Sequence, residues 1–142
     1  MNNDFEELKK QTVDALKKSS EEFEKLKETF VSASDCFDDG KDLDGLQIVQ
    51  DAVHPGISAL CHFVENIFSS FNEGFDNELK EELIIKIEEA EKLIKNLSEE
   101  TVSANFTEIG DILRFDFTDL VDDFEEIFPK MIIEIQKMKE EE

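Results

Sequence analysis

Residues 106–131 read FTEIGDILRFDFTDLVDDFEEIFPKM, and the spacing of their apolar side chains decides the fold. The apolar residues recur every three or four positions: Phe106, Ile109, Leu113, Phe117, Leu120, Phe124, Ile127 and Met131. This period matches the 3.6 residues per turn of an α-helix and places all of them on one face. The stretch therefore predicts an amphipathic helix, opened by a capping box in which Asn105 stands three residues before Glu108.

Three further stretches carry the same helical spacing, at about residues 4–34, 46–71 and 77–97. None of them alternates apolar and polar residues as a half-buried strand would. At 142 residues the chain fits one domain, and its 39% share of hydrophobic residues suffices for a core. We therefore predict a single all-α domain over residues 1–142, folded as an antiparallel four-helix bundle.

Asp, Gly and Pro residues mark the predicted ends of these helices. Residues 35–45 hold five Asp and two Gly, which predicts a break that closes with a helix cap at Asp44. Pro55 should kink or restart the second helix, because proline has no backbone N–H to donate. The third helix should begin after a cap at Asp76 or Asn77.

The two halves of the chain match one another. A shift of 60 residues lays the apolar positions of the second helix on those of the fourth and pairs Asp51 with Asp111. The first and third helices match at a shift of 71, and the eleven-residue difference equals the length of segment 35–45. We therefore predict a duplicated pair of helices, with repeats over 4–75 and 76–138 and an acidic insertion at 35–45 in the first copy.

The charge of the chain is high and uneven. The net charge is −22, from 37 acidic residues against 15 Lys and Arg. Residues 35–78 carry a net charge of −9 and residues 101–128 one of −7, whereas the first and third helices balance most of their acids with Lys. Proteins bind nucleic acids and anionic membranes largely through Lys and Arg side chains, so direct binding to either is not expected. A charged partner should be a basic protein.

No segment of the sequence predicts export or membrane insertion. Residues 1–10 contain no apolar run, and no stretch approaches the roughly 20 apolar residues that span a bilayer. Cys36 and Cys61 lack the spacing of a redox or metal motif, which is typical of a reducing compartment. We expect a soluble cytoplasmic protein, and the sequence leaves its oligomeric state open.

The residue types that catalysis and metal binding need are sparse. The only histidines are His54 and His62, and the second half of the chain has no matching pair for a di-metal site. On a helix, His62 points about 100° away from its neighbour Cys61. The Asp-rich segment does not fit an EF-hand loop, although Asp42 and Asp44 are candidates for a weak calcium contact. We expect no enzyme activity, no cofactor and no dedicated metal site.

Carboxylates are the strongest candidates for a functional site. Four acids of the fourth helix follow the spacing i, i+3, i+4, i+7 opposite its apolar face, at roughly one charge per 3 Å, near the ~3.4 Å per phosphate along one DNA strand. A fifth acid stands one turn earlier. Together they form the acidic face: Asp116, Asp119, Asp122, Asp123 and Glu126. The Asp-rich segment adds further predicted partner-binding residues: Asp38, Asp39, Asp42 and Asp44.

Two hypotheses of different classes fit this pattern. In size, charge and helical content the chain is similar to nuclease-immunity proteins and phage-encoded DNA mimics, without sharing a motif with them. That similarity implies a non-catalytic inhibitor that occludes a basic surface of a nuclease or nucleic-acid-binding protein. The alternative is a small acidic chaperone of the flagellar or type III secretion kind, which holds an export substrate in a groove. The candidate groove residues are Phe63, Phe68, Phe75, Phe115 and Phe128.

Overall fold

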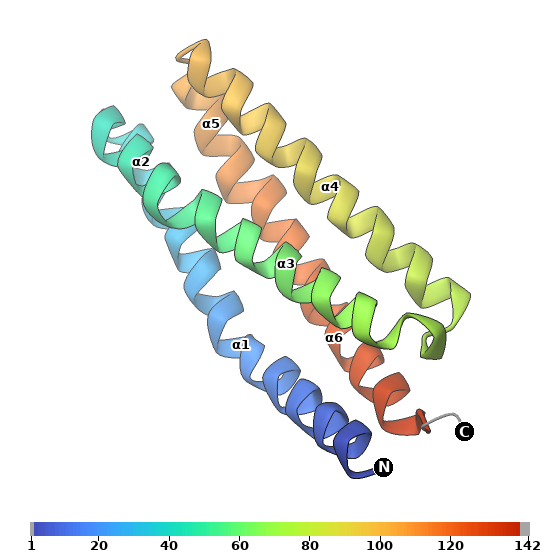
Figure 1. Ribbon diagram of the computed structural model, residues 1–142. Coiled ribbons are helices and arrows are strands. Elements are labelled where there is room, and N and C mark those ends of the chain that lie inside the picture. The colour runs from blue at the N-terminus through green and yellow to red at the C-terminus, as the bar shows by residue number, and fades with distance from the viewer. Residues whose placement is uncertain (1, 140–142) are drawn as a thin grey trace.

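The computed structural model describes residues 2–139 and confirms the all-α four-helix bundle. Four helical rods run antiparallel to one another, joined by short turns, and the described residues contain no strand (Figure 1). Two rods are single helices, α1 (Asn2–Asp38) and α4 (Asn77–Val102). None of the helices in this part of the chain has the length and apolarity to cross a membrane.

The other two rods are built from three pieces each. The second rod consists of α2 (Asp42–Ile48), the π-helical segment η1 (Val49–Val53) and α3 (His54–Phe71). The fourth rod consists of α5 (Phe106–Asp111), the π-helical segment η3 (Ile112–Phe117) and α6 (Thr118–Lys137). A 3-10 turn, η2 (Asn72–Gly74), leads from the second rod toward α4. Both halves of the chain therefore repeat the order of long helix, short helix, π segment and long helix.

Both helix pairs reverse direction through the same backbone motif. At the end of α1, the Lys41 amide donates to the Cys36 carbonyl at 2.8 Å around Gly40, whose φ of 76° is left-handed. At the end of α4, the equivalent bond is 3.0 Å long and encloses Ala104, which has a φ of 55°. These are Schellman turns, in which a left-handed residue ends the helix and satisfies its last carbonyls. Each turn lets the chain reverse within three residues.

The predicted break at 35–45 is wrong in extent, because α1 continues four residues into it and α2 begins before its end. Phe37 supplies the physical reason. Its ring is 8% exposed and stacks on Phe106 with centroids 5.8 Å apart. The ring also packs so closely on Gly45 that a Cβ there would lie 2.8 Å from it. Asp44 consequently lies inside α2 instead of capping it.

The structure also changes the register that relates the two halves. Superposing the two Schellman turns needs a single shift of 64 residues, in place of the predicted shifts of 60 and 71. At this shift seven buried residues of the second rod fall on seven buried residues of the fourth, from Val49 on Leu113 to Phe71 on Ile135. The two halves are thus related without an eleven-residue insertion. Their origin by duplication stays a prediction.

Helix α3 begins at His54 with Pro55 in its first turn, as a restart at this proline predicts, and no non-helical residue separates it from η1. The π segment η1 directly precedes α3, and the His54 amide donates to the Val49 carbonyl five residues back. Pro55 has no N–H with which to continue the ladder, and the wider π turn before it accommodates the missing bond. Of the predicted caps, Asp76 accepts a hydrogen bond of 2.8 Å from the Leu79 amide, whereas Asn105 stands at the N-cap of α5 without the predicted side-chain hydrogen bond.

Phenylalanine side chains fill the centre of the bundle. Phe30 of α1 and Phe117 of η3 are fully buried, with ring centroids 5.5 Å apart. Further along the bundle, the ring centroid of Phe128 of α6 lies 5.0 Å from that of Phe23 of α1 and 6.1 Å from that of Phe63 of α3. All of the apolar positions predicted for the fourth rod pack in the core or against it. The apolar period thus identified the buried face correctly.

Replacing Phe117 with Ala should lower the free energy of unfolding by about 3–5 kcal/mol, because the substitution leaves a cavity in a fully buried site. Phe115→Ala is the matched control, since that ring is 58% exposed and its loss should cost less than about 1 kcal/mol. Urea unfolding followed by circular dichroism measures both. Equal losses in the two variants would show that the fourth rod is rotated from the orientation described.

Candidate functional site

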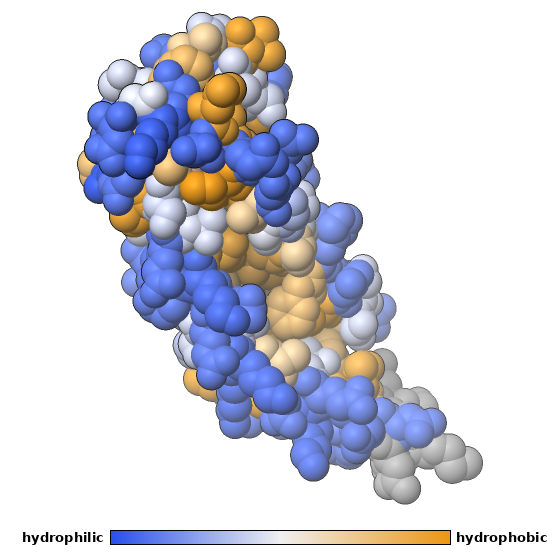
Figure 2. Space-filling model, turned by 90° about the vertical axis from the view of Figure 1, so that its left-hand side faces the viewer, coloured by the Kyte–Doolittle hydropathy of each residue, from blue (hydrophilic) through white to orange (hydrophobic). Residues whose placement is uncertain are grey.

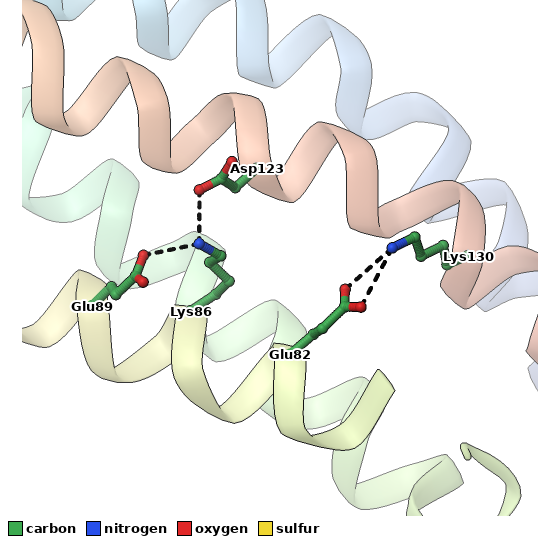
Figure 3. A network of polar contacts seen from close by, with 5 residues as sticks. All are labelled: Glu82, Lys86, Glu89, Asp123 and Lys130. Carbon is green, nitrogen blue, oxygen red and sulfur yellow. Dashed lines mark hydrogen bonds and ion pairs between the residues drawn. The ribbon is translucent and has the colours of Figure 1, made fainter. Parts of the chain in front are cut away.

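Helix α6 lies between α1 and α4, and each neighbour contributes a lysine that pairs with it. Lys27 Nζ of α1 is 2.9 Å from Asp122 Oδ1 and 2.6 Å from Glu125 Oε1. On the other side, Lys86 Nζ of α4 is 2.8 Å from Asp123 Oδ2 (Figure 3). Consecutive helix residues point about 100° apart, so Asp122 and Asp123 turn toward opposite neighbours. Two residues of the predicted acidic face are therefore paired with lysines of neighbouring helices.

Both lysines are held in their charged form. Hydrogen bonds to Glu125 and Asp122 raise the pKa of Lys27, with burial acting in the opposite direction. A hydrogen bond to Asp123 is the largest cause that raises the pKa of Lys86. The pKa of each lysine is therefore higher in the folded than in the unfolded state. The ion pair stabilises the fold fully at a pH below the unfolded-state pKa, and this stabilisation is lost as the pH rises through the folded-state pKa.

A second contact joins α4 and α6 one turn away. Lys130 Nζ of α6 is 3.4 Å from both carboxylate oxygens of Glu82, and Lys86 Nζ also reaches Glu89 at 3.1 Å (Figure 3). The two ion pairs between these helices have opposite polarity: the lysine belongs to α4 in one pair and to α6 in the other. Because each pair matches particular residues, the contacts favour one alignment of α6 along α4.

The only arginine of the chain neutralises part of the Asp-rich segment. Arg114 of η3 forms an ion pair with Asp35 and lies 3.5 Å from Asp38 Oδ2. Its Nε donates to Ser34 Oγ at 3.1 Å, and this hydroxyl donates to the Gly110 carbonyl at 3.0 Å. Ser34 is 2% exposed, so the network closes the α1 to η3 contact with a satisfied buried polar group. Sequence reasoning missed Ser34 and Asp35, although an isolated arginine among acids was a usable signal.

Three residues of the acidic face remain exposed and uncompensated. We call Asp116, Asp119 and Glu126 the open carboxylates, because no Lys, Arg or His nitrogen of residues 2–139 lies within 4.0 Å of them. They belong to η3 and α6, on the side turned away from the core. Within the described residues no cation pairs directly with them, so they are available to a cation of another molecule.

The structure does not gather all of the predicted partner-binding residues on one surface. Asp39 is exposed in the turn after α1, while Asp42, half-buried, and Asp44, exposed, lie in the first turn of α2, at the same end of the bundle (Figure 1). The acidic face instead follows the side of η3 and α6. Arg114 lies between the two groups through its contact with Asp38. The side of the fourth rod is the better candidate, because its open carboxylates are not shared with a cation.

A groove runs between the fourth rod and α4. Asp116, Asp119 and Asp123 form one wall, and Leu93 and Leu120 add apolar lining to a volume of about 500 Å³. The opposite wall, on α4, consists of Glu89, Lys92 and Asn96. A cationic side chain entering the groove would meet four carboxylates and one amine. The leucines would cover its aliphatic stem.

The five candidate phenylalanines of the chaperone hypothesis do not line a common groove. Phe75 and Phe128 are each 3% exposed, and Phe63 and Phe68 are half-buried against the core. Phe115 stands apart on η3 and is 58% exposed. Figure 2 shows a different feature on the face it presents, a hollow in which apolar residues lie between hydrophilic ridges.

The residues considered for catalysis do not form a reactive pair. Burial raises the pKa of the Cys61 thiol to about 11, with smaller contributions from Glu65 and Glu91. At neutral pH this thiol is therefore protonated, and it is a poor nucleophile. His62 is exposed on the neighbouring position of α3. Within residues 2–139, no three His, Cys, Asp or Glu side chains are grouped so that they could hold a metal ion.

Comparison with known protein families assigns the chain to one of them. A family model described as "Domain of unknown function (DUF8042)" matches residues 14–127, which is most of the chain, and the protein belongs to this family. The matched region contains the acidic face and the Asp-rich segment. Neither curated proteins nor solved structures gave a match.

Replacing Lys27 with Met should lower the free energy of unfolding at pH 7 by about 1–2 kcal/mol, between the values of exposed and buried ion pairs. Lys25→Met is the control, because Lys25 is 71% exposed and should contribute less than about 0.5 kcal/mol. Since folding raises the pKa of Lys27 above 10.5, the difference between wild type and Lys27→Met should be full at pH 9 and shrink above 10.5. Denaturant unfolding across this pH range tests both points. A difference that grows above pH 10.5 would contradict the ion-pair assignment.

Proposed function

We propose that this protein is a non-catalytic binding protein that covers a basic surface of another protein. The open carboxylates carry the proposal, because they stay uncompensated next to acids that the bundle neutralises internally. Lys27 and Lys86 pair with Asp122 and Asp123, yet within residues 2–139 no lysine pairs with the open carboxylates. A surface charge left unpaired lowers stability through repulsion, and a partner of opposite sign would relieve that repulsion.

Occlusion is the proposed mechanism. A rigid helix holds its carboxylates in fixed positions, so a basic partner does not have to order them on binding. The charge of −22 steers a cationic protein toward this chain and speeds association, and salt weakens both effects. Nucleases and nucleic-acid-binding proteins are the proposed partners, because their basic surfaces are built to receive rows of negative charge. The carboxylates would occupy the places of phosphates.

The groove beside the open carboxylates supports the same partner class. Leu93 and Leu120 offer apolar contact for the stem of a Lys or Arg side chain, while Asp116 and Asp119 accept its charged end. A flat acidic surface would provide only the second of these contacts. The proposed site of action is the cytoplasm, where nucleases and nucleic-acid-binding proteins meet their substrates.

A secretion or assembly chaperone is the second candidate, and the apolar hollow in Figure 2 favours it. Rods α1 and α3 diverge from one another away from the turn that joins α1 to α2 (Figure 1). An apolar helix of an export substrate could occupy such a hollow. Binding there would depend on buried apolar area and would survive high salt, whereas occlusion by carboxylates would not.

Neutralising the open carboxylates through Asp116→Asn, Asp119→Asn and Glu126→Gln should weaken partner binding at least about tenfold in about 50 mM salt, because three ion pairs of about 0.5 kcal/mol each are lost. The difference from wild type should shrink in about 500 mM salt. The measurement uses the partner captured from lysate of the native host at low salt and then purified, with Kd determined by biolayer interferometry.

The control variant removes three charges from the exposed surface of α1 instead, through Asp14→Asn, Glu21→Gln and Glu28→Gln. It should keep its affinity within about twofold, because long-range steering alone contributes little to Kd. If both triple variants lose affinity equally, only net charge matters and the acidic face is not a site. A partner whose affinity neither variant changes, and which salt does not displace, would favour the chaperone hypothesis.

A further inference from the structure

Phe115 is the one phenylalanine that the bundle leaves at the surface. The chain has thirteen, and the other twelve are buried or half-buried. The neighbouring apolar residues of η3, Ile112, Leu113 and Phe117, are at most 1% exposed, whereas Phe115 is 58% exposed. Because those three residues hold η3 against the core, Phe115 cannot turn inward without displacing them. Its ring therefore contributes little to folding and is available for contact with another molecule.

The Phe115 ring lies among the exposed carboxylates of the fourth rod, which we call its acidic surface. Asp111 precedes it by four residues and Asp119 follows it by four, which places one carboxylate on the neighbouring turn at each side. Both are exposed, and neither has a cation within 4.0 Å among the described residues. An exposed aromatic ring flanked by uncompensated carboxylates matches the requirements of one kind of contact, a cation that is partly apolar.

Arginine fits this arrangement better than the other cationic side chain. Its planar guanidinium stacks on an aromatic face, is weakly hydrated, and keeps its N–H donors free at the edge for carboxylates. Lysine carries a compact and strongly hydrated charge, which gains less from an exposed ring. Residues 2–139 contain one cation–π contact, with Lys9 Nζ 5.7 Å from the centre of the Phe5 ring. Phe115 has no such partner among the described residues.

We propose that Phe115 is the anchor of the acidic surface and that it receives an arginine side chain of the basic partner, whose guanidinium lies on the ring while Asp111 and Asp119 accept its N–H groups. This inference rests on the proposed function and specifies the chemistry of its central contact. It predicts that this protein recognises its partner through an arginine side chain of the partner, and that positive charge alone does not suffice. It also gives the π segment η3 a role, since this segment carries the ring, and π turns recur at functional sites.

The test uses deca-arginine and deca-lysine peptides as probes, titrated into the full-length protein by isothermal calorimetry. Wild type should bind deca-arginine more tightly than deca-lysine, and Phe115→Ala should weaken deca-arginine binding about three- to tenfold and remove most of the preference. Phe115→Leu, which keeps apolar area but no ring, should behave in the same way. The salt dependence should keep its slope in both variants, because no charge is removed. Ile133→Ala, at a site 52% exposed on α6, is the control and should bind as wild type does.

Two failures can be told apart. If Asp116→Asn with Asp119→Asn and Glu126→Gln weakens deca-arginine binding while both Phe115 variants bind as wild type does, the anchor is wrong and the acidic surface stands. If neither set of variants changes peptide binding, the fourth rod is not the binding surface, and both the proposed function and the role of Phe115 are contradicted. Equal affinity of wild type for the two peptides would also overturn the arginine assignment.

Discussion

The position of α6 between Lys27 and Lys86 is the constraint on which the rest of this structure depends. The fourth rod buries an almost continuous apolar face, which provides most of the driving force for its packing. The same rod carries the densest row of acids in a chain of charge −22, and it must pack beside helices that are themselves acidic. A lysine on each flank offsets that repulsion where the helices touch. With one cation on α1 and one on α4, α6 can rotate in neither direction without breaking a pair.

These pairs divide the carboxylates of the fourth rod into two groups with different roles. Asp122, Asp123 and Glu125 lie at the flanks and serve the fold, whereas Asp119 and Glu126 point between the flanks and contact no cation of the described chain. Phe115 stands on this same outward side. The fold therefore produces a surface that combines fixed negative charge with one exposed aromatic ring, and this combination is more specific than net charge alone.

The sequence predicted the four helical rods because the apolar period is a local property. The apolar positions of the fourth rod and the cap at Asp76 needed no knowledge of neighbouring helices. The break at 35–45 was predicted too long because the contacts of Phe37 with Gly45 and Phe106 join residues far apart in the chain. The two shifts relating the halves were wrong for the same reason, since only the Schellman turns reveal the common register.

The candidate site could be predicted only in part. A helical projection gives the direction of a carboxylate around its own axis, and so the acidic face was found. It does not say which flank lies against a lysine, and so Asp122 and Asp123 were grouped with residues that are free to bind. The Arg114 network with Ser34 and the isolation of Phe115 depend on how η3 meets α1. Neither follows from spacing within one helix.

Hydrogen–deuterium exchange of the protein with and without its captured partner distinguishes a contact on the fourth rod from one elsewhere, because it locates the contact without any substitution. We expect added protection in η3 and the first half of α6, over residues 112–126, with exchange in α3 unchanged. Protection confined to α1 and α3 would contradict it and would place the contact in the apolar hollow on that side of the bundle.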